Sequence, residues 1–175
     1  CLVAIKGLEP TSYYPGFGTG LVRSLGFATA PIGGSVHRGG SFHEPVTSFP
    51  RMVKALGKDL AERYDKGHIY EGSGIILAIH NDWLAAGDCV ACRMLTGIDP
   101  ESVNEGDYAR LISTLTGVEI DADGFVKVGE RIFNVEKAFN LREGFRRKDD
   151  TLPERFFVEK PVQLRDFQMA TKVLE

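Results

Sequence analysis

The chain has 175 residues, a mass of 19.2 kDa and a formal net charge of −3 at pH 7. Its hydrophobic content of 43% and charged content of 26% are ordinary for a globular protein and argue against a disordered, collagen-like or coiled-coil chain. The near balance of charge also argues against nucleic-acid binding, which depends on a basic excess or patch. No apolar stretch approaches the roughly 20 residues that span a bilayer, so we expect no membrane segment.

Cysteine content and the chain ends bear on location and completeness. Three cysteines cannot form a disulfide framework, which favours a reducing compartment, and we expect the cytoplasm. Residues 1–7 lack the charged start and long apolar stretch of a signal peptide. The chain starts without Met and stops at Glu175 inside a predicted helix. The length favours a single domain over residues 1–175, and the two chain ends lead us to expect a fragment excised from a longer protein.

Residues 16–40 form a glycine-rich arm. It contains Gly16, Gly18, Gly20, Gly26, Gly33, Gly34, Gly39 and Gly40, and it is flanked or interrupted by Pro10, Pro15 and Pro31. Such a composition predicts neither a long regular helix nor a central strand. Two interpretations stay open: a long surface loop, or a backbone that lies against a cofactor. A dinucleotide or phosphate loop is disfavoured, because Arg23 replaces the third glycine of the fingerprint and no strand precedes it.

Apolar residues recur at helical spacing in five segments after the arm. The first predicts an amphipathic helix of about four turns through Met52, Val53, Leu56, Leu60 and Tyr64. The others are a helix from about 75 to 94 with a break at Gly87, one around 108–115 capped by Gly117, one around 125–139 ending at Gly144, and one from about 164 to 174. Strand signals are weak, and residues 2–5 are the best candidate. The predicted fold is all-α: an irregular multi-helix domain with a glycine-rich N-terminal arm and little or no sheet.

Cys89 and Cys92 form a CxxC pair, and on a helix the two sulfurs share one face. Such a pair can bind zinc, ligate an iron–sulfur cluster or cycle as a redox dithiol. A structural zinc site needs four ligands, and no second pair is present. A thioredoxin-like role needs a βαβ context, whereas these surroundings are helical. Two buried structural cysteines remain the alternative.

The histidines differ in their surroundings. His37 lies in the glycine-rich arm, where a titratable imidazole is a candidate acid–base group. His80 lies in an apolar helical segment beside Asp82 and Trp83, which predicts a core or boundary residue. The mixed charges of residues 142–150 are typical of a solvated face with weak ion pairs.

Four segments, in this order, resemble the C-terminal part of the tungsten-containing aldehyde ferredoxin oxidoreductase family. Residues 3–9 (VAIKGLE) resemble its KG(L/M)E segment, and residues 20–38, which include His37 and Arg38, resemble its GLxxATSxRG(A/G)xHLR pattern. Residues 82–93 resemble its DxxGLC(K/R) motif. Residues 129–156 give the longest and most continuous resemblance, and the four segments together cover most of the chain.

The resemblance implies a tungsten bis-pterin cofactor beside a single 4Fe–4S cluster. It implies that three cluster cysteines lie upstream of this chain and that Cys92, a metal ligand, is the fourth. Asp88 matches the aspartate that hydrogen-bonds a pterin, and His37 matches a histidine near the tungsten, a candidate catalytic proton donor or acceptor. The spacing departs from the family, because three residues separate Asp88 from Cys92 where the family has four.

The function implied by the resemblance is oxidation of an aldehyde to a carboxylic acid, with two electrons leaving through the cluster to ferredoxin or another acceptor. The implied partners are that acceptor and upstream domains of the same polypeptide, and a homodimer stays open. We expect the fragment alone to be inactive. Three alternatives remain: a tungsten subunit of a benzoyl-CoA reductase-like enzyme, a helical module that binds zinc through Cys89 and Cys92, and a degenerate family member kept as an assembly subunit.

Overall fold

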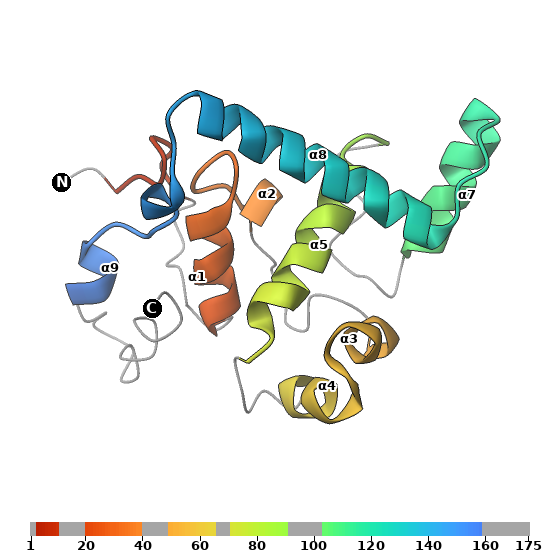
Figure 1. Cartoon of the computed structure of the whole chain (residues 1–175), viewed down its shortest axis with the longest axis horizontal. Coiled ribbons are helices and arrows are strands. Elements are labelled where there is room, and N and C mark those ends of the chain that lie inside the picture. Colours follow the sequence, from red (N-terminus) through yellow and green to blue (C-terminus); the bar gives the residue numbers. More distant parts are fainter. Residues whose placement is uncertain (1–2, 11–19, 40–48, 66–70, 91–102, 159–175) are drawn as a thin grey trace. The chain divides into compact units, whose positions relative to one another are not determined.

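A computed structural model describes residues 3–10, 20–39, 49–65, 71–90 and 103–158, and this part of the chain is helical (Figure 1). In chain order the elements are α1 (Gly20–Thr29), α2 (Val36–Gly39), α3 (Phe49–Leu56), α4 (Lys58–Asp65), α5 (Ser73–Gly87), α7 (Glu105–Thr116), α8 (Ala122–Arg142), the 3-10 helix η1 (Arg147–Asp149) and α9 (Arg155–Val158). The predicted all-α class is confirmed, and the described residues hold no sheet. Among these helices, none is long and apolar enough to cross a membrane.

The chain divides into two compact units, each with its own hydrophobic core. Unit 1 combines Cys1–His43 with Asn140–Glu175, and unit 2 is Glu44–Phe139. The core of unit 1 is formed by Ile5, Phe27, Ala28, Leu152 and Phe156. The core of unit 2 is formed by Trp83, Leu84, Ala86, Tyr108, Ala109 and Phe125. The expected single domain over residues 1–175 stays a prediction.

The N-terminal segment of unit 1 turns back on itself. Ile5 N donates to Leu8 O at 2.9 Å and Leu8 N donates to Ile5 O at 3.0 Å, which makes an isolated antiparallel bridge. The two residues between them have positive φ angles, 49° at Lys6 and 83° at Gly7, as a two-residue type I′ turn requires. The strand predicted over residues 2–5 is therefore wrong for the described residues 3–5, because the chain reverses where a strand would continue.

Within the glycine-rich arm, α1 is a regular helix of 10 residues that the composition did not predict. The glycines have a packing role here. A Cβ atom at Gly39 in α2 would lie 2.7 Å from the carbonyl carbon of Gly26 and 2.6 Å from Cβ of Ala30, and closer still to the Gly26 oxygen. The backbones of α1 and α2 can approach this closely only because Gly39 has no side chain.

The first predicted helix of unit 2 is wrong as a single element. The chain forms two helices, α3 and α4, separated at Gly57, which has a φ of 80°. Gly57 N donates to Val53 O at 2.9 Å and so closes the last turn of α3. A left-handed glycine at this place ends a helix, because it reorients the chain without a steric penalty.

The other helix predictions for unit 2 are largely confirmed. Helix α5 ends at Gly87, where the break was predicted. Helix α7 ends at Gly117, whose φ of 74° makes it the predicted cap, and it begins with a capping box formed by Asn104 and Asp107. Helix α8 ends at Arg142, two residues before the predicted stop. The helix predicted from about 164 to 174 lies outside the described residues.

Helices α5 and α8 cross at a glycine (Figure 1). A Cβ atom at Gly129 would lie 2.5 Å from the carbonyl carbon of Asp82 and 3.1 Å from Ala86 N, and closer still to the Asp82 oxygen. One helical turn before Gly129, Phe125 stacks on Tyr108 with ring centroids 5.3 Å apart and planes 2° from parallel. The crossing therefore brings the backbone of α8 directly onto α5, with an aromatic cluster beside it.

Candidate functional site

Asp88, Cys89 and Val90 follow the end of α5. Asp88 is the C-cap residue, half-buried, and its backbone N–H donates to Leu84 O at 3.1 Å. Cys89 is an exposed free thiol whose Sγ donates to Ala85 O at 3.7 Å. Cys92 lies outside the described residues, so its predicted role as a metal ligand stays a prediction. In the part of the chain that the structure describes, no three His, Cys, Asp or Glu side chains gather as a metal site.

Buried polar side chains precede this segment on α5. His80 is 4% exposed and its ring lies 5.8 Å from that of Trp83, which confirms the prediction of a core or boundary histidine. Asn81 is also 4% exposed, and its Oδ1 has no hydrogen-bond partner among the described residues, nor does Trp83 Nε1. A buried polar atom without a partner costs free energy, and these two atoms, two residues apart and so on different sides of α5, each leave a hydrogen bond unmade within the described residues.

Asn81 is a buried polar residue that the sequence did not single out. Its only signal in the sequence was a polar amide within an otherwise apolar helical stretch. This signal does not distinguish a buried amide from an exposed one, because the burial of the position is not known from the sequence.

The pKa of the Asp82 carboxyl is raised. Burial, and secondarily the negative charge of Glu130, raise the pKa of this carboxyl from 3.8 to about 6. Both effects disfavour the charged form, so Asp82 exchanges its proton much closer to neutral pH than an ordinary aspartate. The backbone carbonyl of the same residue lies against Gly129 at the crossing of α5 and α8.

His37, the predicted catalytic residue, lies in α2 of unit 1. Its backbone is described, whereas its side chain lies outside what the structure describes. Asp88 belongs to unit 2, so the two residues are placed in separate units. Their predicted roles, proton transfer and pterin binding, stay predictions.

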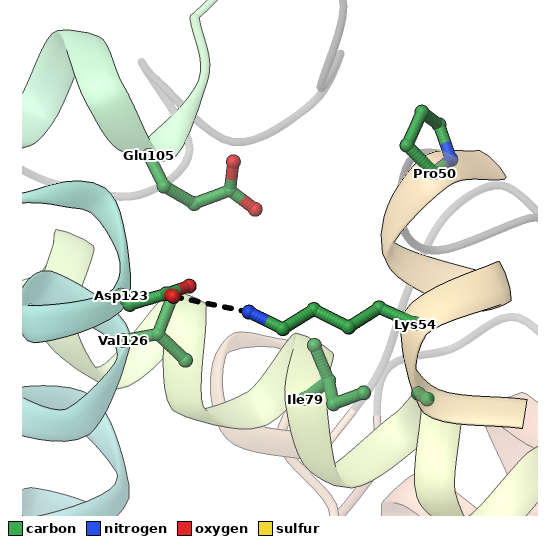
Figure 2. A pocket seen from close by; sticks show the side chains of 7 residues that line it. Pro50, Lys54, Ile79, Glu105, Asp123 and Val126 are labelled. Atoms are coloured by element: carbon green, nitrogen blue, oxygen red, sulfur yellow. Dashed lines mark hydrogen bonds and ion pairs between the residues drawn. The ribbon is translucent and has the colours of Figure 1, made fainter.

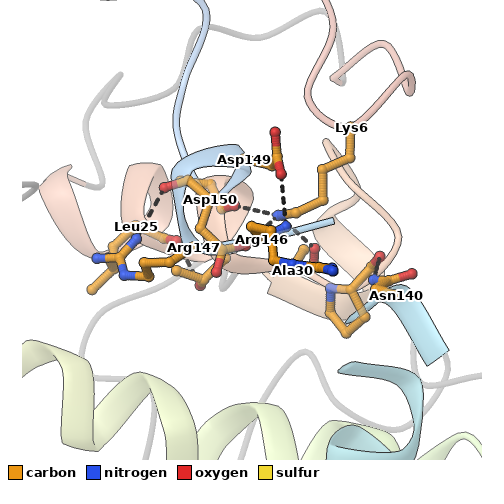
Figure 3. Close-up of polar contacts among 11 residues, drawn as sticks. Lys6, Leu25, Ala30, Asn140, Arg146, Arg147, Asp149 and Asp150 are labelled. Carbon is orange, nitrogen blue, oxygen red and sulfur yellow. Dashed lines mark hydrogen bonds and ion pairs between the residues drawn. The ribbon is translucent and has the colours of Figure 1, made fainter. Parts of the chain in front are cut away.

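The connection between α1 and α2, residues 30–35, is held by a buried lysine (Figure 3). The Lys6 side chain is 4% exposed, and its Nζ lies 2.6 Å from Asp150 Oδ1. The same Nζ donates to Ala28 O at 2.6 Å and to Ala30 O at 3.2 Å. Asn140 Nδ2 donates to Pro31 O at 2.6 Å. The side chains of Lys6 and Asn140, which are far apart in the sequence, therefore both hydrogen-bond backbone carbonyls of this connection.

The predicted solvated face of residues 142–150 needs one correction. Arg142, Arg146 and Arg147 are exposed, as expected, but Asp149 and Asp150 are partly buried, and Asp150 pairs with Lys6. The carboxylate is drawn inward because the buried ammonium group needs a counter-charge. The pair joins two of the segments on which the family resemblance was based, residues 3–9 and 129–156.

A surface pocket of about 520 Å³ lies elsewhere in unit 2 (Figure 2). Its lining residues are Pro50, Lys54, Ala55, Ile79, Glu105, Asp123 and Val126. Lys54 Nζ and Asp123 Oδ2 lie 3.0 Å apart across it, but both side chains are largely exposed, so the pair contributes little stability. None of the predicted site residues lines this pocket.

Comparison with known proteins gives one family and several relatives. Residues 1–173 match the family model described as aldehyde ferredoxin oxidoreductase, domains 2 and 3. The chain is 27% identical over 158 residues to the tungsten-containing aldehyde ferredoxin oxidoreductase of Pyrococcus furiosus, and the protein of that name from Thermococcus kodakarensis gives the same value. These matches cover 90% of this chain and 24% of each relative. The Pyrococcus horikoshii protein is 38% identical over 76 residues, which are 43% of this chain and 11% of that protein. The chain thus spans about a quarter of the length of the first two relatives.

Proposed function

Because the chain belongs to the aldehyde ferredoxin oxidoreductase family, we propose that it is the C-terminal cofactor-binding part of a tungsten-pterin oxidoreductase. The observation that supports this most strongly is the match to the family over residues 1–173. The proposed reaction converts an aldehyde and water into a carboxylic acid, two protons and two electrons. The electrons leave through a 4Fe–4S cluster to ferredoxin or another acceptor.

The residues at the end of α5 have the chemistry that one edge of such a cofactor site needs. A 4Fe–4S cluster is held by four cysteine thiolates, and this sequence has three cysteines, so the chain supplies only part of the ligand set. An ionised Asp88 accepts hydrogen bonds, which matches the N–H groups at the edge of a pterin. On the same helix, the buried Oδ1 of Asn81 has no hydrogen-bond partner among the described residues, which supports a polar neighbour from outside them.

Each residue has one proposed task. Cys92, as a thiolate, would hold the cluster, and Asp88 would orient the pterin by accepting its hydrogen bonds. An imidazole nitrogen of His37 takes a proton from the water that adds to the aldehyde, and returns it to solvent. When bound, the metal–pterin group supplies the two-electron redox step, whereas the protein supplies position and electrostatics.

The test uses the full-length protein purified without oxygen, with tungsten and iron measured per chain and aldehyde oxidation coupled to ferredoxin reduction. We expect Cys92→Ala to lose iron and activity. Cys89→Ala is the matched control, because its exposed thiol lies only three residues away, and it should keep both. Equal iron in the two variants would contradict the assignment of Cys92.

The alternatives give different results in the same preparation. Stoichiometric zinc without tungsten would favour the zinc module. Reduction of an aromatic acyl thioester, without aldehyde oxidation, would favour a benzoyl-CoA reductase-like subunit. A full-length chain without three further cysteines upstream would favour the assembly subunit.

A further inference from the structure

We propose that Lys6, Asp150 and Asn140 are positioning residues, which fix the α1–α2 connection (residues 30–35) and through it the place of His37. The inference rests on the proposed function, in which His37 transfers a proton. It assigns a catalytic consequence to a buried ion pair that lies outside the predicted cofactor residues.

Helix α2 cannot hold its own position. It has 4 residues, Val36–Gly39, which is little more than one turn. A single isolated turn is unstable in water because nucleating a helix fixes several backbone angles for one hydrogen bond. The backbone of His37 is therefore placed by the segments on either side of it. On the far side Gly39 is packed against Gly26 and Ala30, and on the near side lies the α1–α2 connection.

Lys6 acts on the start of this connection. Its ammonium group has three N–H donors and faces three oxygens: Asp150 Oδ1, Ala28 O and Ala30 O. The two carbonyls belong to the C-terminal end of α1, where carbonyls lack partners within the helix and a cation is favourable. Loss of the ammonium group would remove this donor from both carbonyls and remove its ion pair with the Asp150 carboxylate.

Asn140 (Figure 3) and the close approach of Gly33 to Ile5 hold the middle of the connection. Asn140 Nδ2 donates to Pro31 O, the only backbone polar group that a proline offers. Gly33, with a φ of 78°, lies so close to Ile5 that a Cβ would be 3.2 Å from the Ile5 carbonyl carbon and closer to its oxygen. The connection is thus fixed by side chains from both chain segments of unit 1.

The test compares Asn140→Ala and Lys6→Met in the full-length enzyme, each alone and combined with His37→Ala. Asn140→Ala removes one hydrogen bond and keeps the ion pair, so it tests the idea even if Lys6→Met fails to fold. Lys148→Ala is the matched control, because Lys148 is an exposed lysine in the same unit. A displacement of about 1 Å can cost up to 100-fold in rate, so we expect kcat to fall roughly 10- to 100-fold. KM, tungsten and iron should stay near the wild-type values.

The combined variants decide between positioning and general stability. If Asn140 and Lys6 act through His37, adding either substitution to His37→Ala should lower kcat no further. Losses that multiply, or a kcat for Asn140→Ala equal to that of Lys148→Ala, would overturn the proposal. Full turnover by His37→Ala alone would refute the proposed role of His37, and this inference with it.

Discussion

Helices α5 and α8 can cross where they do only because residue 129 has no side chain, and Gly129→Ala tests this directly. The added Cβ would overlap the Asp82 carbonyl and lie 3.1 Å from Ala86 N, so both near neighbours are backbone atoms that no rotamer change can move. Overpacking by one carbon costs about 1–3 kcal/mol, and a backbone-to-backbone clash belongs at the upper end. Alanine recovers about 1 kcal/mol of helix propensity, which leaves a net loss of about 2 kcal/mol.

For a chain of this length, about 1 kcal/mol corresponds to a shift in Tm of roughly 2–4 °C, so Gly129→Ala should lower Tm by roughly 4–8 °C. The matched control is Gly74→Ala on α5, where nothing lies within 4 Å of an added Cβ. It gains propensity without a clash and should raise Tm by roughly 2–4 °C. Thermal unfolding followed by far-UV circular dichroism measures both. If the two variants shift Tm in the same direction, the close crossing of α5 and α8 is refuted.

Two further predictions concern unit 2. Asp82 has a raised pKa, so its folded form holds the proton more tightly than the unfolded form, and stability from this group falls as pH rises from about 4 to above 6. The full shift would correspond to about 3 kcal/mol, which solvent screening of this half-exposed carboxyl reduces to about 1 kcal/mol. In denaturant titrations, Asp82→Asn should therefore be more stable than wild type by about 1 kcal/mol at neutral pH and equally stable at about pH 4. An equal gain in stability at both pH values would contradict the raised pKa of Asp82. Asn104→Ala removes the acceptor for Gly106 N and Asp107 N at the start of α7 and should cost about 1 kcal/mol in the same titrations, whereas an unchanged midpoint would argue against the cap.

The helices that the sequence predicted well are those in which spacing and end signals agree. Helices α7 and α8 have apolar residues at three- and four-residue intervals, and α7 ends at a left-handed glycine. Gly57 shows why the same reasoning failed between α3 and α4. The apolar spacing of Met52, Leu56 and Leu60 continues in register across it, so a glycine tolerated within a helix and one that ends it look alike in the sequence.

The glycine-rich arm shows a second limit. Its composition left a surface loop and a backbone against a cofactor both open, whereas in the described residues the glycine backbone lies against other backbone of the same unit: Gly39 meets Gly26 and Gly33 meets Ile5. A glycine-rich composition shows that side chains are missing, but it does not show which atoms fill the space beside the glycines. The contacts of Lys6 with Asp150, and of Asn140 with Pro31, join residues far apart in the sequence and have no local signal at all.

These contacts change what the family resemblance says about activity. Residues 3–9 and 129–156 contain Lys6, Gly129 and Asp150, whose roles in the structure are an ion pair and a helix crossing. Their contribution to folding is enough to explain why these three residues are present. A non-catalytic assembly subunit would therefore need them as much as an enzyme does. The segment from Asp88 to Cys92 differs, because the family resemblance assigns its carboxylate and its thiol to the pterin and the cluster. The decision between oxidoreductase and assembly subunit therefore rests on that segment, and restoring the family spacing by inserting one residue between Asp88 and Cys92 tests it. In an enzyme adapted to the shorter spacing the insertion should lower iron content, whereas an assembly subunit should show no change.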